Sequence, residues 1–199
     1  MIRLELTKSS VRSMDISDLL SNVHFDYLNR FEPRAREHYR LLISLTRQFN
    51  NASFLDLGTS HGASAFCLAA NPTNKVLSLD VDKNNKHVDV WGELYFKFPS
   101  NITFNIDDAV ELATSFYDNY DIIMLDISHN GADERQIYDR ICESSFSGLL
   151  IMDDINYKRF PELNYTWKNI KNRTKVELHY GHYSGTGLIP FDNIELVIS

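Results

Sequence analysis

The chain has 199 residues, of which 43% are hydrophobic and 24% are charged, and its formal net charge at pH 7 is −7. This length and composition indicate one globular domain and argue against a disordered or fibrous chain. The negative net charge would repel a phosphate backbone, so we expect no nucleic-acid partner.

Targeting and membrane segments are not expected. No apolar run approaches the roughly 18 residues that a membrane-spanning helix needs, and the start "MIRLELTKSS" lacks the apolar core of a signal peptide. The prediction is therefore an intracellular, cytoplasmic protein with no membrane partner. Cys67 and Cys142 have no metal-type spacing, so we expect them to be buried thiols.

Helical periodicity marks the first quarter of the chain. Between Asp15 and Asn50, apolar residues recur at steps of three and four. They are Ile16, Leu19, Leu20, Val23, Tyr39, Leu41, Leu42, Leu45 and Phe49. Pro33 falls between the two groups, where it suits the first turn of a second helix. Residues 1–50 are therefore predicted to form an N-terminal helical cap.

The period then changes to short apolar runs that alternate with helical stretches. Five such runs cover residues 54–57, 76–79, 102–106, 122–125 and 149–152, and each is followed by an acidic or glycine-containing turn. This alternation is typical of repeated βαβ units, so it predicts an α/β fold with a parallel sheet and helices on both faces.

The last segment, "KVELHYGHYSGTGLIPFDNIELVIS", is rich in strand formers and has no helical period. It predicts an antiparallel strand pair at the edge of the parallel sheet. We therefore divide the single domain into the cap (1–50), a core that holds the candidate ligand residues (51–160), and a C-terminal helix with antiparallel strands (161–199).

A glycine turn follows the first of the five runs, in "FLDLGTSHGASAFCLAA". Gly58 and Gly62 bracket the turn, and the small residues Ser60 and Ser64 keep it open. Such a turn lets the backbone approach a ligand closely, and the next helix offers its N-terminus to a carboxylate or phosphate. A merely tight connection is the alternative.

Acidic residues end the next two runs. Asp80 closes "VLSLD", where a carboxylate can accept hydrogen bonds from the two hydroxyls of a ribose. Asp107 and Asp108 close "FNIDD", where one carboxylate can accept from an adenine amino group. Each acid alone is often a solvated strand end or a helix cap, but acids after successive strands favour a nucleoside site.

Residues 53 to 155 resemble the class I S-adenosylmethionine (SAM)-dependent methyltransferases, which have a Rossmann-like sheet of seven strands. "DLGTSHGASA" resembles their first SAM motif, Asp80 their ribose-binding acid, and "DDA" at 107–109 their adenine-side motif. Ser60 stands where many members have glycine, as in the metal-dependent O-methyltransferases with an "LGT" turn. The resemblance implies SAM contacts from Asp56, Gly58, Thr59, Ser60, Gly62, Ser64, Asp80, Asp107, Asp108 and Asp126.

Acids also close the fourth and fifth runs. Asp126 follows one run, and Asp153 with Asp154 follow the next, 27 residues after Asp126. This separation fits one βαβ unit, whose two strand ends open onto the same edge of a sheet. Carboxylates gathered there would bind Mg²⁺, Mn²⁺ or Ca²⁺ in preference to zinc. The alternative is that these acids cap turns or face solvent.

His129 follows Asp126 by three residues. A histidine beside a metal-bound hydroxyl can remove its proton, although a lone loop histidine is often a surface residue. Metal-dependent O-methyltransferases place a lysine or histidine base at this spacing, and "SHNGADERQIYD" resembles the sugar-modifying members. The resemblance therefore implies that His129 and Asp126 are catalytic and that Asp126, Asp153 and Asp154 bind the metal.

The function predicted by these features is O-methylation of a sugar or glycan hydroxyl, with SAM and Mg²⁺ or Mn²⁺ as cofactors. The alternatives are an O-methyltransferase of a catechol or other phenol, and a non-catalytic SAM- or nucleotide-binding module. A homodimer is a further expectation, because a second subunit often walls the open active-site edge. Residues 32–42, and residues 179–191 with His179, His182 and Tyr183, are candidates for substrate contact.

Overall fold

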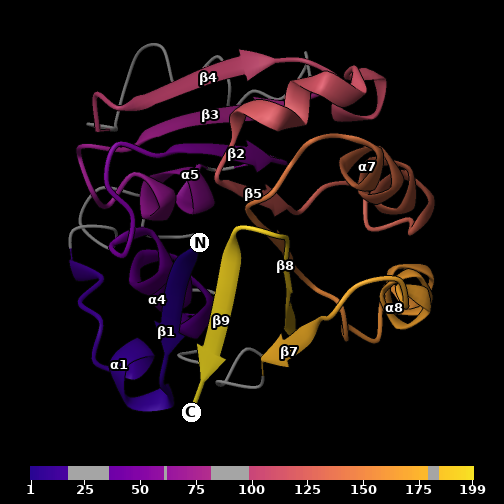
Figure 1. Ribbon diagram of the computed structural model, residues 1–199. Helices are drawn as coiled ribbons and strands as arrows, with labels where there is room; N and C mark the ends of the chain where they lie inside the picture. The colour runs from indigo at the N-terminus through magenta and orange to yellow at the C-terminus, as the bar shows by residue number, and fades with distance from the viewer. Residues whose placement is uncertain (18–35, 61, 82–98, 179–183) are drawn as a thin grey trace.

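The computed structural model describes residues 1–17, 36–60, 62–81, 99–178 and 184–199. Its centre is a seven-stranded sheet with strand order β4-β3-β2-β5-β6-β8-β7. The strands are β2 (Ser53–Leu57), β3 (Lys75–Asp80), β4 (Ile102–Ile106), β5 (Ile122–Leu125), β6 (Leu149–Met152), β7 (Val176–Leu178) and β8 (Thr186–Pro190). The five predicted runs are thus the first five strands of this sheet, and Figure 1 shows β4, β3 and β2 side by side.

The direction of the strands confirms the predicted fold class. Strands β4, β3, β2, β5 and β6 are parallel, whereas β8 is antiparallel to both β6 and β7. Helices with their own apolar faces cover such a sheet on both sides. They are α4 (Arg36–Thr46), α5 (Ala63–Leu68), α7 (Ala132–Glu143) and α8 (Pro161–Asn169), with short 3₁₀ helices η1 (Ala109–Glu111) and η2 (Thr114–Asn119).

Alternating side chains of the central strands build two hydrophobic cores. In β2, Phe54 belongs to the core under α4 and α5, while Leu55 and Leu57, one and three residues further along the strand, belong to the core under α7 and α8. Successive side chains of a strand point to opposite faces, so continuous apolar runs such as β5 serve both cores at once. Figure 1 shows the two helix pairs on opposite sides of the sheet.

The first residues correct the prediction that the entire 1–50 segment is helical. Strand β1 (Ile2–Leu6) pairs in parallel with β9 (Ile194–Ile198) in a separate two-stranded sheet, and α1 (Lys8–Arg12) follows it. Leu4 and Leu6 are buried while Arg3 and Glu5 are exposed, which is the two-residue period of a strand. The last strand of the tail therefore lies outside the main sheet, whose antiparallel pair is β7 and β8.

The two cysteines differ in their exposure to solvent. Both cysteines are free, but Cys67 is buried whereas Cys142 is partly exposed, so the buried-thiol prediction is wrong for Cys142. Within the described ranges, every helix is too short or too polar to cross a membrane.

Candidate active site

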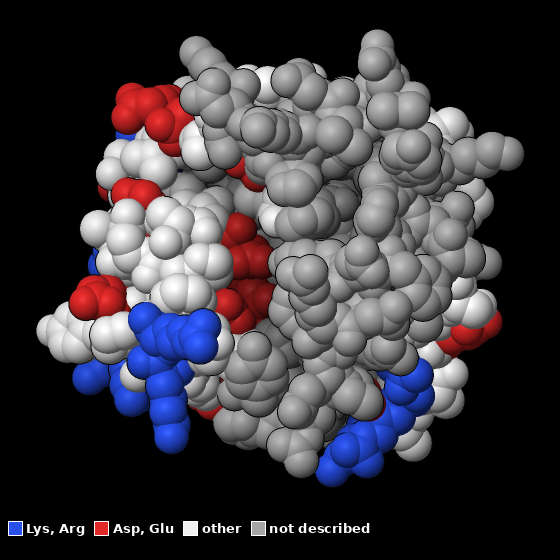
Figure 2. All heavy atoms as spheres, turned by 180° about the vertical axis from the view of Figure 1, so that it is seen from behind, with Lys and Arg blue, Asp and Glu red and all other residues white. Residues whose placement is uncertain are grey.

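A pocket of 610 Å³ opens at the carboxyl ends of the parallel strands. Six aspartates contribute to its lining, namely Asp80, Asp107, Asp108, Asp126, Asp133 and Asp154. Acidic side chains gather in a hollow of the molecular face shown in Figure 2. Parallel strands place their carboxyl ends at one edge, so acids far apart in sequence meet there.

The turn after β2 brings backbone to the pocket. Gly58 has a φ of +98°, and a Cβ at this position would lie 1.6 Å from the carbonyl oxygen of Asp126. The amides of Gly58 and Thr59 donate to the carbonyl oxygen of Leu79 at 2.9 and 3.2 Å. Only glycine therefore allows this turn to pass so close to the end of β5 while it is held against β3.

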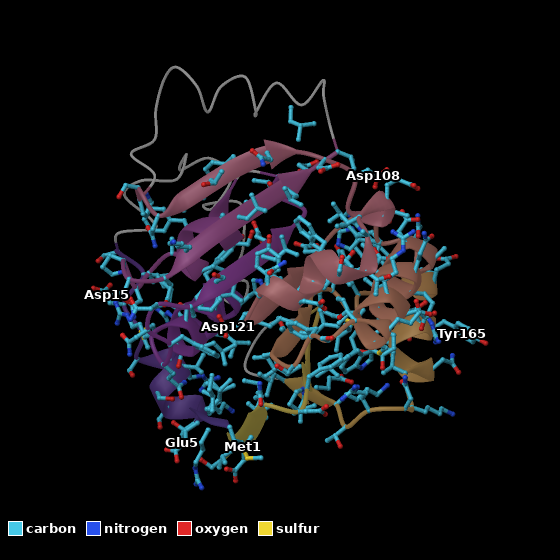
Figure 3. All side chains as sticks on the ribbon, turned by 45° about the horizontal axis from the view of Figure 1, so that its top comes forward. Met1, Glu5, Asp15, Asp108, Asp121 and Tyr165 are labelled. Carbon is cyan, nitrogen blue, oxygen red and sulfur yellow. The ribbon has the colours of Figure 1, made fainter. Side chains whose placement is uncertain are left out.

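The acids after β3 and β4 line the same end of the pocket. The Oδ2 atom of Asp80 accepts a hydrogen bond from the Ser60 amide at 2.9 Å, and both residues line the pocket. Asp108 caps η1 by accepting from the Val110 amide at 2.9 Å, and Figure 3 shows it beyond the end of β4. Apolar Val81 and Val110 line the pocket beside these acids. Carboxylates next to apolar surface suit a ligand with hydroxyl groups and a flat ring.

Another group of predicted cofactor residues lies behind the turn. Asp56 is fully buried, and its Oδ2 accepts from the hydroxyls of Ser78 and Ser64 at 2.6 and 3.1 Å. The hydroxyl of Thr59 lies 2.7 Å from that of Ser78, to which it must donate because Ser78 donates to Asp56. Asp56, Thr59, Gly62 and Ser64 are not among the described residues that line the pocket. They stabilise the turn that Gly58 and Ser60 present.

We expect Asp56→Asn to stabilise the protein more at pH 8 than at pH 5. Burial raises the pKa of Asp56 from 3.8 to about 7. The folded state therefore keeps a proton that the unfolded state loses near pH 4, so stability from this group is lost as the pH rises from about 4 to about 7. Asparagine still accepts from Ser64 and Ser78 but carries no charge. Thermal unfolding of both proteins at pH 5 and pH 8 measures the effect, and a pH-independent difference in Tm would contradict it.

His129 lies between two of the predicted metal ligands. Its buried Nε2 is 2.8 Å from Oδ1 of Asp126 and 3.4 Å from Oδ2 of Asp154, but the described residues give it no well-aligned hydrogen bond. The ring of Phe160, just before α8, stacks on the imidazole with centroids 4.2 Å apart. The imidazole is thus held by charge on its edge and by an aromatic ring on its face.

The backbone at this point is bent into a conformation that only glycine adopts freely. His129 has a φ of +59° and Asp154 a φ of +55°. A left-handed conformation costs a residue with a side chain about 1 kcal/mol, and such residues cluster at functional sites. Both groups that face each other across this part of the pocket therefore have strained backbones.

The charge of His129 follows from its neighbours. Burial alone lowers the pKa of the imidazole, but Asp126 and Asp154 outweigh this effect and raise the pKa to about 10. The ring is therefore an imidazolium at neutral pH while both carboxylates face it. It can act as a base only after the negative charge beside it has been compensated.

Solved structures show which fold this arrangement belongs to. An SAH-bound methyltransferase from Podospora anserina is superimposed with a TM-score of 0.61 and 12% identity, covering 88% of this chain and 93% of that chain; SAH is the demethylated form of SAM. A Staphylococcus aureus protein assigned as a caffeoyl-CoA O-methyltransferase gives a TM-score of 0.62 and 16% identity over 91% and 94% of the chains. A Bacillus cereus O-methyltransferase in complex with SAH gives 0.57 and 13% over 89% and 90%.

The chain has the fold of SAM-dependent O-methyltransferases. No model of a protein family and no curated protein sequence matches the chain. The likeness to methyltransferases therefore lies in the arrangement of the strands and helices. Sequence identities of 12 to 16% establish the shared fold and nothing more.

The two adjacent aspartates after β6, Asp153 and Asp154, face different partners in this methyltransferase fold. Asp154 faces His129, whereas buried Asp153 lies with Oδ1 3.5 Å from Nδ1 of His38 and accepts from the Thr186 hydroxyl at 3.3 Å. Thr186 in turn lies 3.2 Å from the same His38 nitrogen. His38 belongs to α4, so the N-terminal segment contacts a predicted metal ligand, Asp153, but neither His38 nor Asp153 is among the described residues that line the pocket.

The metal site stays a prediction. In the described ranges, no group of three or more histidine, cysteine or acidic side chains is arranged to hold a metal ion. His179, His182 and Tyr183 lie outside the described residues. Sequence reasoning also missed Phe160 and Glu134, which contact His129. The glutamate three residues after Gly131 is a capping-box spacing and could have indicated its role.

Proposed function

We propose that this protein is a SAM-dependent O-methyltransferase that transfers a methyl group to a hydroxyl of a sugar or glycan. The observation that carries the proposal is His129, held between Asp126 and Asp154 at the edge of a methyltransferase fold. The acids after β3 and β4 line the same pocket as His129, although they lie far from it in the sequence. One pocket therefore offers a nucleoside end and an acid-base end.

The nucleoside end suits SAM by its chemistry. Asp80 offers carboxylate oxygens to ribose hydroxyls, and Val81 and Val110 offer apolar surface to adenine. Gly58 leaves room for the methionine part to approach the backbone. Six aspartates in the lining also favour a ligand with positive charge, which the sulfonium and ammonium groups of SAM provide.

At the other end, the neutral His129 imidazole takes the proton of the acceptor hydroxyl. The oxygen then forms a bond to the methyl carbon as the carbon–sulfur bond breaks, and the electron pair of that bond stays on sulfur. The residues accelerate this transfer by holding the two reactants in line and by removing the proton. Since Asp126 and Asp154 raise the pKa of His129 to about 10, this role requires compensation of their charge.

A divalent cation is the second part of the proposal. Asp126 and Asp154 supply oxygen donors, and Asp153 adds a third negative charge near Asp126, so the donor chemistry fits Mg²⁺ or Mn²⁺. When bound, the cation polarises the acceptor hydroxyl. The compensation of the carboxylate charges also favours a neutral His129.

The acceptor class has two candidates. The histidine three residues after Asp126 supports a sugar hydroxyl, by resemblance to the sugar-modifying O-methyltransferases. A phenol is the second candidate, because the S. aureus neighbour is assigned as acting on caffeoyl-CoA, which carries phenolic hydroxyls. The proposed partner is in both cases a small-molecule or glycan acceptor.

Calorimetry and labelled methyl transfer test the proposal. We expect SAM to bind, methyl groups to pass to one of a panel of glycans and phenols, and EDTA to abolish transfer until Mg²⁺ or Mn²⁺ is restored. The absence of SAM binding would contradict the whole proposal, and binding without transfer to any acceptor would favour a SAM-binding module. Transfer that survives both EDTA and Asp126→Ala would contradict the metal alone.

A further inference from the structure

A buried carboxylate lies directly beneath the loop that carries His129. Glu134, in the first turn of α7, is only 1% exposed. Its Oε1 accepts from the His129 amide at 2.7 Å, and its Oε2 accepts from the Gly131 amide at 2.7 Å. The hydroxyl of Ser128 lies 3.5 Å from the same Oε1. One buried side chain therefore contacts three residues of the loop, Ser128, His129 and Gly131.

Capping of the helix does not explain this arrangement. The side chain of Asn130 already accepts from the amides of Ala132 and Asp133 at 2.8 and 2.9 Å, so two amides of the first turn of α7 are capped without Glu134. The bond from the Gly131 amide to Glu134 is the glutamate half of a capping box, but the bond from the His129 amide reaches two residues before the cap. Burying a carboxyl group costs free energy unless it is hydrogen-bonded, and here one of its hydrogen bonds goes to a residue outside the helix.

The rest of the loop is equally constrained. Gly131 has a φ of +76°, and a Cβ there would lie 2.6 Å from the Glu162 carbonyl of α8. The Thr166 hydroxyl of α8 donates to the Gly131 carbonyl at 2.8 Å. With α8 on one side and Glu134 on the other, the His129 backbone is fixed in its left-handed conformation.

We propose that Glu134 is a positioning residue for His129. Its carboxylate holds the loop in the bend that places the imidazole between Asp126 and Asp154, where the acceptor hydroxyl is to be deprotonated. The role in catalysis rests on the proposed methyl transfer, whereas the placement of the ring does not. Glu134 itself touches neither SAM nor acceptor in this assignment.

The kinetic test compares Glu134→Gln in two backgrounds. In the wild-type background, we expect turnover to fall by about tenfold or more, because small displacements of a reacting group are costly, while the Kd for SAM stays unchanged. In the His129→Ala background, the same change should alter turnover by less than about twofold, because residues acting as one unit are not additive. Glu143→Gln, at the exposed end of α7, is the matched control and should have wild-type turnover. An equal loss in both backgrounds would overturn the proposal.

Nuclear magnetic resonance supplies a readout without methyl transfer. The ring signal of His129, identified by its absence in His129→Ala, should shift or broaden in Glu134→Gln and stay in place in Glu143→Gln. An unmoved signal would overturn the positioning role even if the protein proves to be a methyltransferase. A moved signal in a protein that transfers no methyl group would keep the positioning role and contradict the proposed function. If Glu134→Gln does not fold, the shorter Glu134→Asp is measured in the same way.

Discussion

His129→Ala is expected to lower the turnover of methyl transfer by about 10²- to 10⁴-fold, the usual contribution of a general base. The Kd for SAM should stay within about twofold, because His129 belongs to the acid-base end of the pocket rather than to the nucleoside end. Calorimetry with SAM and initial rates at saturating SAM separate the two quantities. Unchanged turnover would remove His129 from the proposed mechanism.

The difference in thermal stability between the wild type and His129→Ala should depend on pH. A histidine whose pKa is raised to about 10 in the folded state stabilises it fully below its unfolded pKa of 6.5, and this contribution is lost as the pH rises through 10. The Tm of the wild type relative to His129→Ala should therefore be greatest near pH 6 and should decline toward pH 10. A difference that grows over this range would mean that Asp126 and Asp154 do not hold the proton on His129.

Gly58→Ala is expected to destabilise the fold by about 4 kcal/mol or more, which is the range of severe core lesions. The new Cβ would lie 1.6 Å from the Asp126 carbonyl oxygen, so β2 and β5 would have to separate at the pocket. The same movement displaces Ser60 from Asp80, and we expect SAM affinity to fall in any variant protein that folds. Denaturant unfolding and calorimetry measure the two effects.

Asn51→Ala separates the clash from the conformational strain. Asn51 is exposed and also has a positive φ, of 56°, so its substitution imposes the left-handed strain without a collision at the pocket. We expect it to cost about 1 kcal/mol and to leave SAM binding unchanged. If both variants lost the same stability, the close approach of Gly58 to Asp126 would have no energetic importance.

The sequence pattern predicted the central sheet because the apolar run of each strand and the length of each βαβ connection are properties of short stretches of the chain. The run 122–125 is apolar at every position, as a strand buried on two faces must be, and an acid follows it at the open edge. The βαβ separation between Asp126 and Asp153 predicted that both strand ends lie at one edge of the sheet. The pairing of β1 with β9 was not predictable in this way, because it joins the two ends of the chain.

In the candidate site, too, some features were predictable from the sequence and others depend on tertiary packing. The sequence predicted which side chains would stand at strand ends, because their position follows from the run that precedes each of them. It could not predict that Asp153 would face His38 while Asp154 faces His129, since adjacent residues of one turn separate according to the backbone angles that packing imposes. Nor could it predict that Asp56 would stay behind the turn, because burial depends on what covers the residue.

The sequence by itself therefore determined the fold class and the strand-end residues that could carry chemistry. Only the tertiary structure decided how those residues are oriented and charged. His129 illustrates the reason: its ring position depends on Glu134 of α7 and Phe160 before α8, and its pKa depends on carboxylates after two different strands. Electrostatic and packing energies depend on distances in space, which the order of residues along the chain does not contain.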